Sequence, residues 1–280
     1  MSKQPIAELF GFPPASNTEE AQRYRRNRLC PYNNKVPNCT KDSIIDPLGV
    51  CTIFHGNDLA VICPVRLRQE WIIADQAAEF FFAKGTQWTT LVEVRLKDRD
   101  GKSAGNIDVV LVAYDKNGVV TDFGSLEAQT VYISGNLRRT FFKPLMENRE
   151  EYLNLDWEKS RKKNPGPDYL SSSRKRLAPQ LIFKGGILDK LKKKSAIAID
   201  QCFFDTLPIP AEVPKEQAEI AWLIYGLEAS RNTEAELHLE YRRTVYTCRP
   251  DNLHEPELFQ DISEEEVLCQ LESEFEKVVV

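Results

Sequence analysis

Apolar residues recur along this chain at two spacings, and each spacing predicts a different kind of element. Over residues 66–85 they follow the spacing of a helix, which is expected to end at Gly85. Beyond it, short apolar runs separated by turn residues predict strands over residues 88–96, 106–115, 119–123 and 124–135. The pair Asn117 and Gly118 favours a tight hairpin turn between two of these strands. A helix followed by three or four strands is typical of an α/β sheet.

The second half of the chain predicts further elements of both kinds. Residues 137–157 are expected to be partly helical, residues 164–167 form a loop, and residues 169–194 predict a helix interrupted near Pro179 and at Gly185-Gly186. Later core strands are predicted over residues 195–207, 218–229 and 236–248. The acidic end, residues 261–280, predicts a surface helix with an apolar stripe formed by Val267, Leu268, Leu271 and Phe275.

Length and composition limit the class of protein. With 280 residues and 42% hydrophobic content, the chain can bury one substantial core, or one core with a small appended module. No apolar run approaches the roughly 20 residues that a membrane span needs. The amino terminus also lacks the extended hydrophobic region of a secretory signal. We therefore expect a cytoplasmic protein without a membrane partner.

Charge is distributed unevenly along the sequence. The segment from Glu255 to Val280 has nine acidic residues and one lysine. Without this segment, whose balance is -8, the net charge of -5 becomes +3 for residues 1–254. The basic residues there gather in six clusters, at residues 23–28, 138–139, 161–163, 174–176, 190–194 and 241–243. A single cluster is usually a solvated face, but six together leave a phosphate-binding surface open as an alternative.

Four of the seven cysteines lie close together in sequence, at Cys30, Cys39, Cys51 and Cys63. Their turn-rich surroundings suit a closed four-thiolate metal site, whose role would be structural because it has no open position for a water molecule. The spacing is not the C-x-x-C of ordinary zinc knuckles, so free buried cysteines and disulfides remain alternatives; a reducing compartment disfavours disulfides. We therefore predict a small metal-stapled module over residues 1–66 and a larger domain over residues 67–280.

Acidic residues stand where the strands should be buried. Asp108 follows Ile107, and Glu127 and Gln129 flank a single alanine. An unpaired carboxylate in such a place costs several kcal/mol, roughly, and a bound cation would remove that cost. Because side chains alternate along a strand, Glu127 and Gln129 point to one face, and Asp108 joins them if the strands are neighbours. Two converging carboxylates suit Mg²⁺, which activates water and neutralises charge on a phosphodiester.

The competing interpretation is that Glu127 and Gln129 line the solvated face of an antiparallel strand while Asp108 caps an element or pairs with a lysine. Glu93 and Glu70 are further candidate carboxylates, although an exposed strand or helix face explains each of them as well. His55, His238 and His254 lie in unrelated contexts, so no Ser-His-Asp or Cys-His arrangement is expected. A glycine-rich phosphate loop is also missing from the sequence.

A cysteine module followed by D…E-x-Q on paired strands resembles the NotI family of type II restriction endonucleases, which belong to the PD-(D/E)xK nuclease superfamily. The resemblance begins at "IAELFGF", runs through "CPYNNKVPNC", "GVC" and "VICPVR", continues into "IDVVLV" and "LEAQT", and covers most of the chain. It implies an α/β nuclease core, a mixed central sheet flanked by helices, with Asp108 and Glu127 as Mg²⁺ ligands. Gln129 stands where the superfamily usually has lysine; it can orient the attacking water but cannot supply a positive charge.

By the same resemblance the four cysteines bind iron, although zinc would accept the same ligands. The leading hypothesis is a Mg²⁺-dependent, site-specific endonuclease that cuts double-stranded DNA as a symmetric homodimer. A companion DNA methyltransferase would then protect host DNA. Two alternatives are a DNA-binding protein on a nuclease scaffold that does not cut, and a metal-stapled protein-interaction domain. Base readout depends on individual side chains, so the resemblance does not carry over a target sequence.

Overall fold

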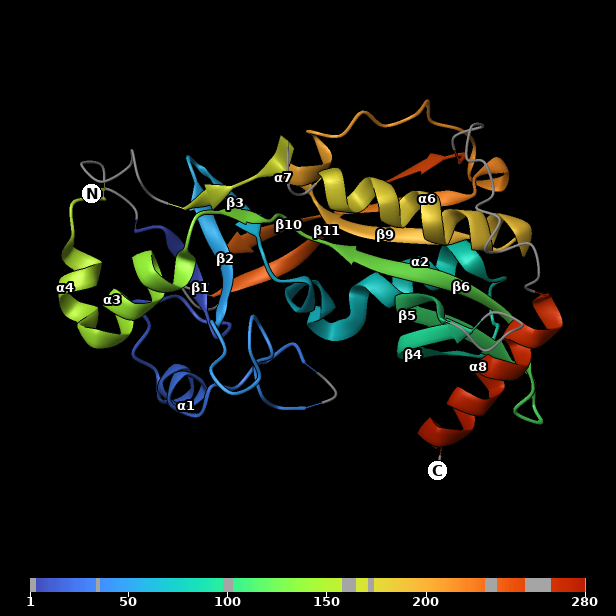
Figure 1. The fold of residues 1–280 in the computed structure, drawn as a ribbon, viewed down its shortest axis with the longest axis horizontal. Coiled ribbons are helices and arrows are strands. Elements are labelled where there is room, and N and C mark those ends of the chain that lie inside the picture. The colour runs from blue at the N-terminus through green and yellow to red at the C-terminus, as the bar shows by residue number, and fades with distance from the viewer. Residues whose placement is uncertain are drawn as a thin grey trace.

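A six-stranded mixed sheet forms the centre of the molecule (Figure 1). The computed structural model describes residues 4–33, 36–97, 103–157, 165–170, 174–229, 236–249 and 263–279. In sequence order the strands of this sheet are β4 (Trp88–Lys97), β5 (Ser103–Tyr114), β6 (Val120–Gln129), β9 (Ser195–Asp200), β10 (Ile220–Ala229) and β11 (Leu237–Thr247). Across the sheet they follow the order β11-β10-β9-β6-β5-β4. Strand β9 is parallel to both of its neighbours, and the outer pairs are antiparallel.

The turn between β5 and β6 forms where the sequence predicts it. One carboxylate oxygen of Asp115 accepts the backbone N–H groups of Asn117 and Val119, each at 2.9 Å. Gly118 adopts a φ of 83°, a conformation that glycine reaches without strain. The runs predicted as two strands over 119–123 and 124–135 instead form β6, which is followed by the short strand β7 (Ile133–Ser134).

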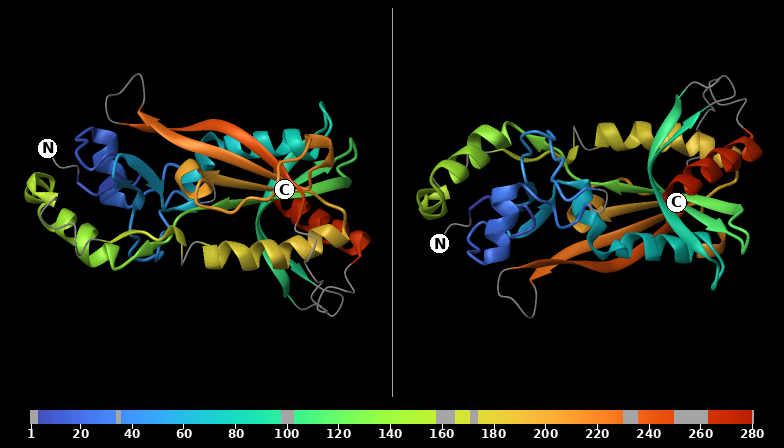
Figure 2. Two further views of the ribbon diagram at one scale, coloured as in Figure 1. Left: turned by 90° about the horizontal axis from the view of Figure 1, so that it is seen from above. Right: turned by 90° about the horizontal axis from the view of Figure 1, so that it is seen from below.

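Helices cover both faces of the sheet. Helix α2 (Ile72–Phe81) packs on one face, and α6 (Arg174–Lys190) lies on the other (Figure 2). Helix α8 (Glu264–Val279) shares the face of α6, because Val110 and Phe123 of the sheet pack in one cluster with apolar residues of both helices. The predicted apolar stripe of the acidic end is confirmed, since Val267, Leu271 and Phe275 are buried and Leu268 packs beside them.

A second, three-stranded sheet lies at one end of the molecule, far from α8 (Figure 1). Its strands β1 (Ile6–Leu9), β2 (Val50–His55) and β3 (Asp58–Val61) are antiparallel, and α1 (Glu19–Asn27) precedes β2 in the chain. Its core is completed by η2 (Arg138–Phe142), α3 (Lys143–Glu147) and α4 (Arg149–Asn154), while β8 (Gly166–Pro167) pairs with β7. Core residues between Ile6 and Ile62 therefore pack with core residues between Leu137 and Trp157, and a domain boundary at residue 66 stays a prediction.

Two further predicted elements differ from the structure. The helix over residues 66–85 is a 3-10 helix, η1 (Pro64–Trp71), joined through a kink to α2, which ends at Phe81. The strand over residues 195–207 stops at Asp200, whose carboxylate accepts the N–H of Phe203 at 2.8 Å and begins α7 (Gln201–Phe204). A short 3-10 helix, η5 (Lys215–Gln217), then precedes β10.

The predicted interruption near Pro179 and Gly185-Gly186 is wrong, because α6 runs through these residues without a break. Gly185 and Gly186 are buried together with Ile187 and Leu188. Packing against the sheet therefore outweighs the weak helix propensity of glycine, about 1 kcal/mol per residue. No helix among the described residues combines the length and the apolar character needed to cross a membrane.

Candidate active site

The carboxylates of the D…E-x-Q pattern meet where β5 and β6 end their pairing. The last paired residues at this end of the two antiparallel strands are Val109 and Leu126. The next residues along the strands, Asp108 in β5 and Glu127 in β6, therefore lie opposite each other. Opposite residues of an antiparallel pair project to the same face. Glu127 and Gln129 also lie beside Ile197 and Ile199 of the parallel strand β9. The structure therefore brings Asp108 and Glu127 together, with Gln129 two residues further along the same strand.

Glu127 is a buried acid with one basic partner. Its residue exposure is 6%, and Nζ of Lys184 in α6 donates to its Oε1 at 2.7 Å. Burial raises the pKa of Glu127 to about 8, and the negative charge of Asp108 adds to this rise, while Lys184 opposes it. Burial and two close carboxylates are the surroundings in which active-site acids are usually found.

The second carboxylate oxygen of Glu127, Oε2, is buried and receives no hydrogen bond from a donor group among the described residues. The nearby Asp108 carboxylate can bond to Glu127 only when one of the two acids is protonated. When Glu127 is ionised, a buried oxygen in this state costs free energy unless a cation or a donor reaches it. Oxygen ligands on two adjacent carboxylates are the donor set that Mg²⁺ prefers. The residues present thus fit a divalent cation held by Asp108 and by Oε2 of Glu127.

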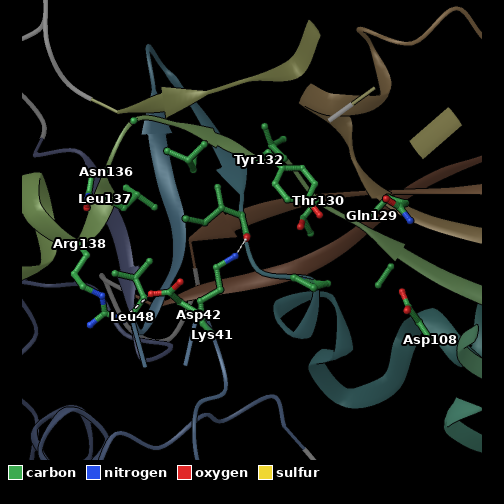
Figure 3. Close-up of a pocket in the computed structure, with 16 residues that line it drawn as sticks. Lys41, Asp42, Leu48, Asp108, Gln129, Thr130, Tyr132, Asn136, Leu137 and Arg138 are labelled. Atoms are coloured by element: carbon green, nitrogen blue, oxygen red, sulfur yellow. Dashed lines mark hydrogen bonds and ion pairs between the residues drawn. The ribbon is translucent and has the colours of Figure 1, made fainter. Parts of the chain in front are cut away.

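Two cavities meet at Gln129. The larger has a volume of about 740 Å³ and is bounded by the loop at residues 41–48, by residues 62 and 64 just after β3, and by residues 128–138. Asp108 lies at one end of it and Arg138 at the other (Figure 3). The smaller cavity, about 20 Å³, lies under α6 and is lined by Glu127, Lys184 and apolar side chains of the helix. Gln129 lines both cavities, and Asp108 lines the larger one, so the carboxylate pair meets the open space at Asp108.

The two further carboxylates lie in different places. Val92 pairs with Val109 and Val94 with Ile107, so Glu93 is opposite Asp108 on the edge strand β4. Glu93 has a φ of 58°, an unusual conformation for a residue other than glycine, and it is exposed. Glu70 lies at the kink between η1 and α2, where Gln69 donates to it at 3.5 Å. Glu93 is thus aligned with the carboxylate pair by strand register, and Glu70 belongs to a different part of the fold.

The four clustered cysteines approach one another through two backbone features. The loop between Cys30 and Cys39 is closed by Cys30 N–H to Pro37 O at 2.8 Å and Cys39 N–H to Arg28 O at 2.9 Å. The β2–β3 hairpin brings Cys51 beside Ile62, whose N–H bonds to the Cys51 carbonyl at 3.0 Å, and Cys63 follows directly.

All four thiols are free, and they influence one another electrostatically. Burial raises the pKa of Cys30 to about 12, and the thiols of Cys63 and Cys39 act in the same direction. Burial likewise raises the pKa of Cys51 well above its ordinary value, with Glu8, Cys63 and Cys30 adding to the rise. Even so, the described residues contain no group of three or more His, Cys, Asp or Glu side chains arranged to hold a metal. The thiols thus interact electrostatically, but the described residues do not arrange them as metal ligands.

A buried ion pair joins this cysteine-bearing end to the central sheet. Nε of Arg66 donates to both carboxylate oxygens of Glu8, at 3.0 and 2.9 Å, and both side chains are 0% exposed. Thr52 also donates to Glu8. The remaining guanidinium nitrogens of Arg66 donate to Gln69 Oε1 at 2.7 Å and to the carbonyl of Leu237 in β11 at 2.8 Å. The sequence offered one signal of this pair: Glu8 is a charged residue inside an apolar run.

Several basic clusters turn out to support the fold. Arg25 is buried and donates to the carbonyls of Pro13 and Ser16. Arg138 pairs with Asp42 at 2.7 Å and with Asp46 at 2.6 Å. Exposed basic residues do occur, among them Arg23, Arg26, Lys192, Arg242 and Arg243. Residues 161–163 and His254 lie outside the described residues.

The other two histidines are held by contacts remote from the carboxylate pair. His55 lies edge-on to the ring of Tyr169, with ring centroids 5.8 Å apart. Nδ1 of His238 shares a hydrogen bond of 3.0 Å with the side-chain amide of Gln69. Neither histidine lines the two cavities beside the carboxylates.

Comparison with known protein families places most of the chain within one family model. A family model described as restriction endonuclease NotI matches residues 17–238, which is well over half of the chain. The matched range includes Asp108, Glu127, Gln129 and all four clustered cysteines. No curated protein sequence matches the chain.

Proposed function

Because this chain belongs to the NotI family of restriction endonucleases, and is therefore a deoxyribonuclease, we propose that it cuts double-stranded DNA at a specific sequence in a Mg²⁺-dependent reaction. The observation that carries this proposal is the carboxylate pair Asp108–Glu127: Glu127 is buried with an oxygen that no donor among the described residues reaches, and its neighbour Asp108 lines a large cavity. We also propose that the mixed sheet is a PD-(D/E)xK nuclease core, since the pair occupies adjacent strands flanked by helices.

The chain's own residues have distinct roles in this proposal. Asp108 and Glu127 would hold the metal, which supplies an activated water and neutralises charge on the phosphodiester. Gln129, at the junction of the two cavities, orients the attacking water through its amide. Burial of Glu127 keeps its surroundings poor in water, which strengthens each electrostatic contact at the site.

The large cavity offers a path for one DNA strand. It extends from Asp108 to Arg138, about 740 Å³ in volume, and Lys41 and Asn136 are among the polar side chains that line it. A phosphodiester entering at Asp108 would meet the carboxylate pair first. Exposed arginines elsewhere on the surface, such as Arg242 and Arg243, are candidates for phosphate contacts.

Three further parts of the proposal rest on the family and on symmetry. Cys30, Cys39, Cys51 and Cys63 would hold a structural iron or zinc ion, supported by the proximity of their thiols, and binding would require them to move into tetrahedral geometry. A homodimer would cut the two strands of a palindromic site. A companion methyltransferase, acting in the same cytoplasm, would protect host DNA.

The test is digestion of a long DNA of known sequence by the purified protein with Mg²⁺, alongside the variant D108N. We expect discrete, reproducible fragments from the wild type and intact DNA from D108N, and no cleavage in EDTA. Intact DNA with the wild type under all divalent metals, together with salt-sensitive DNA binding, would overturn the nuclease proposal in favour of a DNA-binding protein that does not cut. If the wild type degrades the DNA into a continuous range of sizes, the nuclease activity stands and only its sequence specificity is contradicted.

A further inference from the structure

Lys184 stands on the apolar stripe of helix α6. Leu177, Leu181, Lys184 and Leu188 follow one another at spacings of four, three and four residues, which places them on one face of a helix. All four line the small cavity between α6 and the sheet. The lysine thus occupies a position that the pattern reserves for an apolar residue.

A lysine in this place needs a specific partner. Its side chain is 14% exposed and that of Glu127 is 8% exposed, and their charged atoms are 2.7 Å apart. A desolvated ion pair of this kind contributes little net stability compared with well-packed apolar residues. Its presence on the buried face of α6 is therefore better explained by what it does to Glu127 than by the stability of the helix.

The hydrogen bond from Lys184 gives the two carboxylate oxygens of Glu127 different roles. Oε1 accepts from Lys184, and Oε2, which no donor group in the described part of the chain reaches, is left for the cation. Meanwhile Gln129, the neighbour on the same strand face, carries no charge. The positive charge at this site comes from a helix 57 residues further along the chain.

We propose that Lys184 is a positioning residue of the nuclease site: its ammonium fixes Glu127 through Oε1, directs Oε2 toward Asp108, and supplies the positive charge that Gln129 lacks. This inference rests on the proposed function. It differs from a second explanation of the same contact, in which Lys184 is only a counter-ion that the metal displaces when it binds.

The two explanations predict opposite effects of Lys184→Met, which keeps the length and apolar stem of the side chain. A displaced counter-ion competes with the metal, so its removal should leave cleavage as fast as in the wild type or faster. A positioning residue is needed during the reaction, so its removal should slow the bond-breaking step by about 10–100-fold, the usual effect of losing a group that holds a metal ligand.

The experiment compares wild type, K184M and K184R with K192M, a matched control because Lys192 is 80% exposed and pairs only weakly with Asp189, at 3.4 Å. The readouts are single-turnover cleavage of a fragment that the wild type cuts, DNA affinity in Ca²⁺, and Ca²⁺ binding by calorimetry. For K184M we expect cleavage to fall while DNA affinity stays within about threefold and Ca²⁺ binding is no weaker, since a nearby positive charge has been removed. K184R should recover part of the loss, and K192M should match the wild type.

Cleavage by K184M at the wild-type rate would overturn the positioning role while leaving the proposed function intact. Failure of the wild type itself to cut DNA or to bind Ca²⁺ would overturn the proposed function, and this inference with it. If K184M does not fold, K184Q decides, because glutamine retains a hydrogen-bond donor for Oε1 without the charge. Slow cleavage by folded K184Q supports the proposal, and cleavage at the wild-type rate contradicts the need for a charge.

Discussion

Two buried glutamates in this protein have basic partners at nearly the same distance, yet their surroundings differ. Glu8 is 2.9 Å from Arg66, and Glu127 is 2.7 Å from Lys184. Both oxygens of Glu8 accept hydrogen bonds, from Arg66 and from Thr52. Glu127 uses one oxygen and lies close to a second carboxylate, that of Asp108, which lines the large cavity.

The difference shows how a saturated ion pair can be told from a reactive one. A pair whose polar atoms are all satisfied fixes one arrangement of the chain, and here it joins β1 and β2 to β11 through Arg66. A pair that leaves an anionic oxygen unsatisfied keeps a cost that a ligand can relieve. The same isosteric substitution, glutamate to glutamine, should therefore affect stability at one glutamate and activity at the other.

The largest effect is expected from E127Q. We predict that DNA cleavage falls by roughly 10²–10³-fold or more, as is typical when a group that stabilises developing charge is lost. Thermal stability should fall much less than in E8Q, because the amide oxygen still accepts from Lys184 and the repulsion with Asp108 disappears. Cleavage rates and melting temperatures of the same preparation test this. A variant that melts much earlier than the wild type would contradict the contrast with Glu8.

The opposite result is expected from E8Q. This change leaves Arg66 buried, charged and without a carboxylate, and breaking a buried pair in this way costs about 3–5 kcal/mol of unfolding free energy. Urea denaturation measures that loss. In the fraction that remains folded, cleavage per folded molecule should stay close to the wild-type rate, since Glu8 lies outside both cavities at the carboxylate pair. A fully stable E8Q would show that the ion pair does not join the two sheets energetically.

A third buried carboxylate, that of Asp200, extends the comparison, because its burial should make the unfolding free energy depend on pH. Burial raises its pKa from 3.8 to about 7, although backbone N–H groups of Phe203 and Val61 oppose the rise. Between these two pKa values the folded chain binds more protons than the unfolded chain, so the unfolding free energy falls as pH rises from about 4 to 7.

The variant D200N removes this titration and keeps a good helix N-cap. We expect the stability of wild type relative to D200N to fall between pH 5 and pH 8 by on the order of 3 kcal/mol, because each pKa unit corresponds to about 1.36 kcal/mol. Urea denaturation of both proteins at the two pH values gives the difference. If the unfolding free energies of the two proteins change equally between pH 5 and pH 8, Asp200 stays ionised over this range, the state that its N–H donors favour.

Much of the sheet could be predicted because its strands carry their own signals. The β-branched runs predicted β4, β5, β10 and β11, and Asn117-Gly118 predicted the turn before β6. Alternation along β6 also placed Glu127 and Gln129 on one face correctly, and strand pairing brought Asp108 beside them. These features depend on neighbours in sequence or on a single hairpin.

Features that depend on contacts between distant segments could not be predicted. Lys184 reaches Glu127 only because α6 packs on the sheet, and the same packing keeps α6 continuous through Gly185. A sequence signal did exist, since a lysine interrupts the stripe of Leu177, Leu181 and Leu188. For the cysteines, spacing indicated proximity but not geometry, because the positions of thiols depend on loops that a metal can reorganise.

The smallest change in unfolding free energy is expected when an exposed glutamate–arginine ion pair is broken. Arg242 of β11 donates to Glu228 of β10, and their side chains are 39% and 52% exposed. Water and salt screen such a pair, so E228Q should change the unfolding free energy by only about 0–1 kcal/mol. Measured beside E8Q and E127Q by urea denaturation and cleavage, E228Q serves as the exposed member of the series. If E228Q lowers the unfolding free energy as much as E8Q does, burial is not the property that separates these glutamates. The contrast between the fully hydrogen-bonded Glu8 and the partly unsatisfied Glu127 would then need another cause.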